Sequence, residues 1–247
     1  MSATAPVILV TGAARRVGAA IARALHGAGA RIVVHYRASR EEAQTLTTAL
    51  NAERADSALC LPADLRDVAA LRQLVQDSVE RFGRLDGLVN NASSFFATPL
   101  AEIDEAAWDD LVGSNLRAPL FLSQAAAPQL RANRGAIVNI TDIHAEWPLK
   151  NYPLYCAAKA GLLGLTRALA LELAPEVRVN AVAPGPIVWP EDDAFDAGAR
   201  AEVVGRTPLA RTGDPQDIAR TVRFLLFDAP FVTGQVLNVD GGRSVRI

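Results

Sequence analysis

A short apolar segment followed by a glycine-containing turn and a helix constrains the fold of this chain more than any other feature. Residues Val7–Val10 are all apolar, and they lead into Thr11-Gly12-Ala-Ala-Arg-Arg-Val-Gly18 and an alanine-rich helix that should end near Gly27. Gly12 permits a tight turn, and Gly18 allows the helix to pack closely on the strand. Because the helix N-terminus presents free amides and a positive dipole, this segment predicts the first half of a dinucleotide-binding βαβ unit.

The rest of the chain alternates short apolar segments with helical ones, without repeats, linkers or low-complexity stretches. This alternation predicts an α/β fold: a single Rossmann-type, doubly wound parallel sheet with helices on both faces, in one catalytic domain covering residues 1–247. Irregular sequence near residues 187–207, which carries Trp189, Glu191, Asp192 and Asp193, predicts a lid over the substrate. We expect the further strands at residues 31–36, 57–61, 85–89, 136–140, 177–182 and 235–239.

The charge balance gives no reason to expect a polyanionic partner. The chain has 25 basic and 27 acidic residues, for a formal net charge of −2, and the two signs are interleaved. We therefore expect neither nucleic acid nor an anionic membrane as a partner. Arg167 and Glu172 interrupt the most hydrophobic helix, and no signal-type segment stands at the N-terminus, so a cytoplasmic location is expected.

The cysteines and histidines do not form a metal-binding pattern. Cys60 and Cys156 are the only cysteines and lie far apart, which argues against a disulfide framework and fits a reducing compartment. His26, His35 and His144 lie in three different segments without the spacing of metal ligands. We expect no metal.

The end of the second strand favours NADPH over NADH. An enzyme that prefers NAD usually carries an acid there to hold the ribose 2′-hydroxyl, whereas a basic residue accommodates a 2′-phosphate. This chain has Arg37 and Ser39 instead of an acid. The alternative is that Arg37 is a solvated turn residue and Ser39 the N-cap of the next helix. After the third strand, Asp64 either faces the adenine or caps the helix that begins near Asp67.

Two further segments place polar and aromatic groups beside the predicted cofactor crevice. Asn90-Asn91-Ala-Ser93-Ser-Phe95-Phe96 follows the fourth strand, and Phe95 is either a core residue or a face on which a flat substrate stacks. Tyr155 and Lys159 are four residues apart on a long apolar helix, so they project from one face. The ammonium should lower the pKa of the phenol, as a proton donor requires, unless the pair is merely a solvated helix turn. Lys159 is one of two lysines among 25 basic residues.

These motifs resemble, in order and spacing, those of the short-chain dehydrogenases/reductases, and the resemblance covers essentially the whole chain. It implies a nicotinamide cofactor, a catalytic Tyr155–Lys159 pair, a proton path anchored by Asn115, and assembly as a homotetramer through long helices such as the one containing residues 162–173. The matching residues are Thr11-Gly12 with Gly18, Asn90-Asn91-Ala92, Asn115, Tyr155 with Lys159, Pro184-Gly185 and Val239-Asp240-Gly241-Gly242.

Two departures from the usual superfamily pattern resemble the pteridine reductase branch. Asp142 stands thirteen residues before Tyr155, where the superfamily usually has a serine, and Arg16 stands where it usually has glycine. The resemblance implies that a pterin lies between Phe95 and the nicotinamide. Arg16 should then reach both pterin and cofactor phosphate. By itself Asp142 could also be a helix N-cap or an exposed loop acid.

The resemblance thus implies NADPH-dependent reduction of a C=N bond in a dihydropterin or dihydrofolate, with Tyr155 as proton donor, Asp142 aiding the transfer and Lys159 holding the nicotinamide ribose. The runner-up is a reductase of ketones, sugars or acyl thioesters, and a non-catalytic NADPH-binding scaffold is a third possibility. The expected catalytic residues are Asp142, Tyr155, Lys159 and Asn115. The expected cofactor-binding residues are Gly12, Arg16, Gly18, His35, Arg37, Ser39, Asp64, Asn91, Ser93, Tyr155, Lys159 and Gly185. The expected substrate-binding residues are Arg16, Ser93, Phe95, Asp142, Tyr155 and Trp189.

Overall fold

A seven-stranded, wholly parallel sheet forms the centre of the protein, with the strand order β3-β2-β1-β4-β5-β6-β7. The computed structural model describes residues 5–190 and 195–245, so Glu191, Asp192 and Asp193 of the expected lid lie outside the described residues. The strands are β1 (Val7–Val10), β2 (Arg31–Tyr36), β3 (Ala58–Pro62), β4 (Gly87–Asn90), β5 (Ala136–Ile140), β6 (Arg178–Pro184) and β7 (Val236–Val239). Each expected strand is present, with its ends within two residues of the expected positions.

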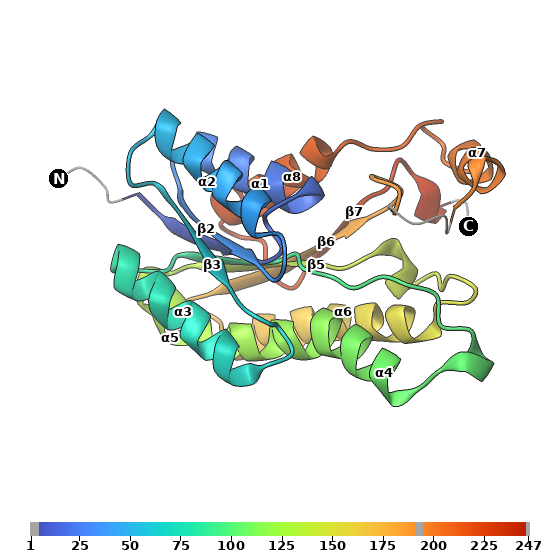
Figure 1. The fold of residues 1–247 in the computed structure, drawn as a ribbon, viewed down its shortest axis with the longest axis horizontal. Coiled ribbons are helices and arrows are strands. Elements are labelled where there is room, and N and C mark those ends of the chain that lie inside the picture. The colour runs from blue at the N-terminus through green and yellow to red at the C-terminus, as the bar shows by residue number, and fades with distance from the viewer. Residues whose placement is uncertain (1–4, 191–194, 246–247) are drawn as a thin grey trace.

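Helices cover both faces of this sheet (Figure 1). One face carries α1 (Arg16–Gly27), α2 (Arg40–Glu53) and α8 (Pro215–Arg223); the other carries α3 (Val68–Phe82), α4 (Glu105–Val112), α5 (Ala118–Asn133) and α6 (Pro153–Glu172). Ile8 and Val10 pack into the first layer, and Val7 and Leu9 into the second. Because each strand is buried on both faces, an apolar run such as Val7–Val10 is what a central parallel strand needs. The predicted doubly wound fold is confirmed.

The site lies where the order of the strands changes direction, between β1 and β4. From β1 the sheet continues to β2 and β3 on one side, and from β4 it continues to β5, β6 and β7 on the other. β1 pairs with β2 on one side and with β4 on the other, so the connections after β1 and β4 leave toward opposite faces. In doubly wound sheets, ligands bind in the crevice that opens at the carboxyl ends of the strands at such a point. The glycine turn after β1 and the polar segment after β4 both lie there.

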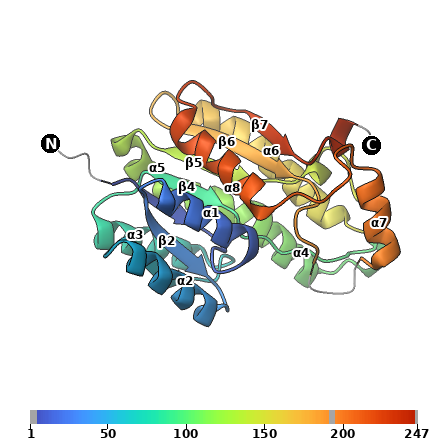
Figure 2. The same cartoon turned by 90° about the horizontal axis from the view of Figure 1, so that it is seen from above.

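The lid segment contains a helix that the sequence analysis did not expect. α7 (Ala197–Gly205) stands apart from both helical layers, beyond the sheet (Figures 1 and 2). Asp196 caps it by accepting a hydrogen bond from the Ala199 amide at 2.7 Å. The expectation of irregular structure was wrong over these residues, because an aspartate cap followed by alanines favours a helix.

Helix α6 combines the length and hydropathy of a membrane-crossing helix with the burial of a core helix. Half of the relevant window, 50%, is buried inside the protein. Leu162, Leu163 and Thr166 are among its buried residues. Such burial is typical of a helix that packs on a sheet, and this packing holds the first turns of α6 in place under the site.

Candidate active site

A cavity of about 850 Å³ opens at the carboxyl ends of the strands. Its wall is built by the glycine turn, the ends of β2 to β6, the start of α6 and the lid. Every predicted site residue except Asn115 lines it. These residues are Gly12, Arg16, Gly18, His35, Arg37, Ser39, Asp64, Asn91, Ser93, Phe95, Asp142, Tyr155, Lys159, Gly185 and Trp189.

The glycine turn has no space for side chains at its two key positions. Gly12 has φ +60°, and a Cβ there would lie 3.0 Å from the Ala92 Cα. A Cβ on Gly18 would overlap the Gly12 carbonyl oxygen and lie 2.7 Å from the Asn91 side-chain nitrogen. The side-chain amide of Asn91 donates a hydrogen bond to the Thr11 carbonyl at 2.8 Å. The backbone is therefore held where a pyrophosphate can approach the N-terminus of α1.

His35 supports this turn from below. Its Nδ1 accepts a hydrogen bond from the Gly12 amide at 3.1 Å, and its Nε2 lies 3.1 Å from the Ala63 carbonyl oxygen. Nε2 therefore carries the proton, since a carbonyl can only accept. Burial lowers the pKa of His35 to about 4, so the ring is neutral. Both ring nitrogens are engaged with the protein, so His35 holds Gly12 in position.

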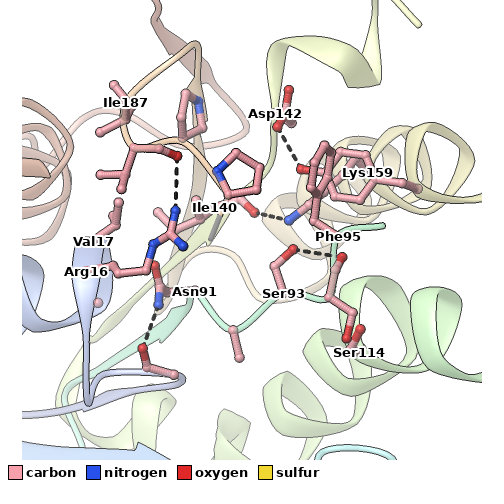
Figure 3. Close-up of a pocket in the computed structure, with 18 of the residues that line it drawn as sticks. Arg16, Val17, Asn91, Ser93, Phe95, Ser114, Ile140, Asp142, Lys159 and Ile187 are labelled. Atoms are coloured by element: carbon pink, nitrogen blue, oxygen red, sulfur yellow. Dashed lines mark hydrogen bonds between the residues drawn. The ribbon is translucent and has the colours of Figure 1, made fainter. Parts of the chain in front are cut away.

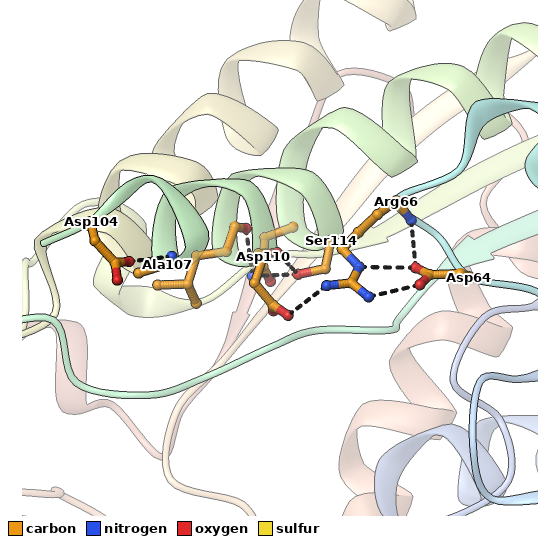
Figure 4. A network of polar contacts seen from close by, with 8 residues as sticks. Asp64, Arg66, Asp104, Ala107, Asp110 and Ser114 are labelled. Carbon is orange, nitrogen blue, oxygen red and sulfur yellow. Dashed lines mark hydrogen bonds and ion pairs between the residues drawn. The ribbon is translucent and has the colours of Figure 1, made fainter.

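The segments after β2 and β3 bring charged groups to the cavity wall. Asp64 accepts two hydrogen bonds from the Arg66 guanidinium, at 3.1 and 2.8 Å, and these hold the pKa of Asp64 at about 2. Arg66 also reaches Asp110 at 3.5 Å, which joins this corner of the cavity to α4 (Figure 4). α3 is capped by Asp67, whose side chain accepts from the Ala69 amide, so capping by Asp64 was wrong.

Ser39 stands at the start of α2 but does not cap it with its side chain. It occupies the N-cap position with no side-chain hydrogen bond to the helix. Ser39 and Arg37 both line the cavity, at its nucleotide end. The alternative of a capping serine is therefore not realised.

Tyr155 and Asp142 meet directly (Figure 3). The phenol donates a hydrogen bond to Asp142 Oδ2 at 2.7 Å, while Asp142 Oδ1 accepts from the His144 amide at 2.8 Å. Asp142 is thus the N-cap of the short 3₁₀ helix Ile143–Ala145 and also the partner of the phenol. The N-cap interpretation of this acid is confirmed, and its role in catalysis stays a prediction.

The electrostatics of the tyrosine differ from the expectation. Burial raises the pKa of Tyr155 well above its ordinary value, and the charge of Asp142 raises it further. The Lys159 Nζ lies 5.7 Å from the ring centroid and donates to the Ile140 carbonyl at 2.9 Å. Burial also lowers the pKa of Lys159 to about 8. The prediction that the ammonium lowers the phenol pKa was wrong for this state of the protein, because burial and the adjacent carboxylate outweigh it.

Asn115 lies behind the cavity wall rather than in it. It belongs to a π-helical turn, Gly113–Arg117, which widens the helix between α4 and α5. Its side-chain nitrogen donates to the carbonyls of Leu111 and Ser94, both at 2.9 Å, and its oxygen accepts from the Ser93 hydroxyl at 2.7 Å. Asn115 therefore reaches the cavity through Ser93 and Ser94. π-turns of this kind are frequent at functional sites.

Phe95 is at once a packed residue and a wall of the cavity. Its ring stacks on Tyr152, with centroids 4.6 Å apart, and meets the Tyr155 ring edge-on at 4.8 Å. It also lines the cavity and is only partly buried. The contact with Tyr152 fixes the plane of the phenyl ring beside the phenol.

Arg16 joins the glycine turn to the segment of residues 187–207, which was predicted to be a lid. Its guanidinium donates to the backbone carbonyls of Val188 at 3.0 Å and Trp189 at 2.8 Å. In Figure 3 the Arg16 side chain points toward the segment at Ile187. Arg16 has φ +54°, a conformation that favours glycine, which explains why glycine is usual at this position. On the lid, the Trp189 ring lies 5.6 Å from the Phe195 ring and carries the Arg200 guanidinium at 5.6 Å.

The cavity residues that the sequence analysis did not single out include Arg66, His144 and Arg243. His144 is oriented by a 2.8 Å contact between its Nδ1 and the Trp147 carbonyl. No signal in the sequence separates these two arginines from the many others, because their relevance depends on contacts with distant segments. Within residues 5–190 and 195–245, no group of three or more His, Cys, Asp or Glu residues is arranged to hold a metal ion.

Together, the doubly wound sheet, the tight glycine turn at its switch point and the buried phenol and ammonium define a nucleotide-dependent oxidoreductase. The family model described as "Enoyl-(Acyl carrier protein) reductase" matches residues 12–244. The chain belongs to the short-chain dehydrogenase/reductase family, whose members use a nicotinamide cofactor.

Similar proteins carry names that point to two kinds of substrate. Pteridine reductase 1 of Leishmania tarentolae is 39% identical, over 99% of this chain and 98% of the relative. The 3-oxoacyl-(acyl-carrier-protein) reductase FabG of Staphylococcus aureus is 38% identical, over 95% of this chain and 96% of the relative. The granaticin polyketide synthase putative ketoacyl reductase 2 of Streptomyces violaceoruber is 39% identical, over 96% of each chain. These identities do not separate pterin reduction from carbonyl reduction.

Proposed function

We propose that the protein reduces a C=N bond of a dihydropterin or dihydrofolate to the tetrahydro form, with NADPH as cofactor. The observation that carries this proposal is the 2.7 Å hydrogen bond from Tyr155 to Asp142. A substrate carbonyl calls for a neutral hydroxyl donor at this position, whereas the nitrogen-rich ring of a pterin is compatible with an acid. The name of the Leishmania relative supports the same substrate class.

The residues at the nucleotide side fit NADPH. The turn between Gly12 and Gly18 is too tight for side chains and leaves the amides at the start of α1 for a pyrophosphate. Arg37 and Ser39 line the cavity where an NAD-preferring enzyme carries an acid. Asp64, Asn91 and Gly185 complete this proposed cofactor wall.

Lys159 fits the nicotinamide ribose. It is 2% exposed, and a lysine ammonium has three donors, of which the Ile140 carbonyl takes one. The hydroxyls of a ribose would supply acceptors to the other two. A buried ammonium with a single neutral acceptor is costly, and further hydrogen bonds would reduce that cost.

When bound, NADPH supplies the hydride, and the protein supplies the proton and holds the substrate. Tyr155 gives its phenolic proton to the substrate nitrogen, and Lys159 stabilises the phenolate that remains. Asp142 and Tyr155 share one proton across their hydrogen bond, so the pair must gain a proton from solvent in each cycle. Asn115, through Ser93, is the proposed path for it.

In this proposal the pterin ring lies against Phe95, with Ser93, Asp142, Arg16 and Trp189 around it. The stack of Phe95 on Tyr152 supports a flat slot, because the orientation of the phenyl ring is already fixed. Residues 187–207 act as the lid of a single catalytic domain. The exposed face of α6, where Leu171 is 84% exposed, supports assembly as a homotetramer. Two free cysteines support a reducing, cytoplasmic location.

A panel assay tests the function. Purified protein should consume NADPH with dihydrobiopterin or dihydrofolate, and more slowly with NADH. The second candidate, a carbonyl reductase, is favoured by the relatives named as ketoacyl reductases. Turnover of a 3-oxoacyl thioester or a simple ketone with none of any dihydropterin would establish that candidate and reject the pterin proposal.

A further inference from the structure

Arg243 contributes a positive charge to the cavity on the side away from the nucleotide. The other arginines of the cavity wall, Arg15, Arg16, Arg37 and Arg66, come from the glycine turn and the segments after β2 and β3. Arg243 comes from the C-terminal segment, which lies beside α7 in Figures 1 and 2. Its guanidinium contacts Val203 of α7, which also lines the cavity. Arg16 already binds the carbonyls of Val188 and Trp189, and Arg66 pairs with two aspartates. Arg243 is the one arginine of the described cavity wall that comes from the C-terminal segment.

The backbone around Arg243 is held rigidly. The Asp240 carboxylate accepts hydrogen bonds from the Gly242 amide at 2.9 Å and the Ser244 amide at 2.7 Å. Gly242 has φ +85°, and a Cβ added to it would lie only 3.0 Å from the Pro208 side chain. Asp240 itself packs on Gly185, at the end of β6. A side chain on such a fixed turn loses less conformational entropy when it binds a ligand.

The guanidinium of Arg243 has donors to spare. Nη1 donates to the Val203 carbonyl at 3.0 Å. Among the described residues, Glu202 and Asp240 act on Arg243 through their charge, and Glu202 forms its ion pair with Arg206 at 2.8 Å. A guanidinium has five N–H donors in a planar fork that matches a carboxylate. Partial burial lowers the pKa of Arg243, and the charge of Arg206 lowers it further. The group nevertheless stays protonated, so an anion in the cavity would be stabilised by it.

We propose that Arg243 binds a carboxylate on the side chain of the substrate, so that the enzyme prefers pterins with an acidic tail, such as dihydrofolate, over pterins with an uncharged tail. This inference rests on the proposed function and deepens it. In this proposal Arg243 determines specificity, because it contacts the acidic tail of the substrate. Tyr155 and Asp142 act on the pterin ring. A paired guanidinium and carboxylate in a partly buried cavity is worth about 10- to 100-fold in binding.

Arg243→Gln tests the proposal, with Arg220→Gln as matched control. Arg220 belongs to α8, its side chain is 77% exposed, and it pairs with Asp217 and does not line the cavity. We expect Arg243→Gln to raise the KM for dihydrofolate by about 10- to 100-fold with little change in kcat, and to leave the KM for dihydrobiopterin and the Kd for NADPH unchanged. The control should change none of these. An equal loss with both substrates, or no loss with dihydrofolate, would overturn the proposal.

A binding measurement separates this inference from the proposed function. Calorimetric titration of the NADPH-loaded protein with N-(4-aminobenzoyl)glutamate, which has the acidic tail but no pterin, should show binding that Arg243→Gln abolishes. This binding can be measured even if the protein turns over no pterin. A lack of pterin turnover together with Arg243-dependent binding would reject the proposed function but not the role of Arg243. Absence of binding to the unaltered protein, or binding that survives Arg243→Gln, counts against Arg243. Arg243-dependent binding of phosphopantetheine without binding of the carboxylate probe would assign the residue to phosphate and also reject the proposal.

Discussion

The phenol of Tyr155 donates a hydrogen bond to the carboxylate of Asp142 at 2.7 Å, and the ammonium of Lys159 lies 5.7 Å from the centroid of the same ring. A tyrosine beside a lysine alone would be expected to ionise more easily. Here burial and the carboxylate together keep the proton on the phenol. Asp142 therefore determines how the tyrosine is protonated before a substrate binds, and the first prediction concerns this acid.

Asp142→Ser should reduce kcat/KM for a dihydropterin by about 100-fold, because it removes the acid that shares the phenolic proton. The pKa of Tyr155 should fall, since one cause of its elevation is lost. NADPH binding, measured by fluorescence titration, should be unchanged, because Asp142 faces the phenol and not the glycine turn. Asp142→Asn serves as the matched control of equal size. Unchanged pterin turnover in both variants would remove Asp142 from the mechanism.

Activity should decline as pH rises through about 8. Burial lowers the pKa of Lys159 to about 8, so the ammonium that favours a phenolate is lost above that pH. The pH profile of kcat/KM reports groups of the free enzyme and is the appropriate measurement. Lys159→Met should lower activity at all pH values, and its pH profile should no longer show the decline near pH 8. A step of the same midpoint in Lys159→Met would assign it to another group.

Stability should fall in mild acid because of His35. The ordinary histidine pKa of 6.5 is lowered to about 4 in the folded protein by burial. Between these two values the unfolded chain binds a proton that the folded chain does not, so stability is full above pH 6.5 and is lost as pH falls toward 4. The loss amounts to ~3 kcal/mol. Urea unfolding at several pH values measures it, and His35→Asn should flatten the slope. An equally steep slope in the variant would contradict the assignment.

Arg16→Gly should separate the strain at this residue from its contact with the lid. Glycine accepts φ +54° without cost, so the variant should gain up to about 1 kcal/mol of stability in urea unfolding. It also loses the hydrogen bonds to Val188 and Trp189, so proteolysis within the lid should become faster. Arg16→Ala, which keeps a Cβ, should show the faster proteolysis without the gain in stability. Equal lid protection in all three proteins would contradict a role for Arg16 in closure.

The sequence allowed the strands and the composition of the cavity to be predicted, because both depend on local pattern. The apolar run Val7–Val10 can only be a central strand, and the carboxyl ends of parallel strands meet at one edge. The contacts of Arg16 could not be predicted in the same way, since its partners Val188 and Trp189 lie 172 and 173 residues further along the chain. The protonation of Tyr155 was also out of reach, because the opposing effects of burial, carboxylate and ammonium depend on distances.

The bridge from Asp64 through Arg66 to Asp110 ties the end of β3 to α4, which runs directly into the π-turn that carries Asn115. In the proposed function, a redesign from NADPH to NADH that changes only the end of β2 leaves this brace intact. Substitutions at Asp110 should then alter nucleotide affinity and proton delivery together.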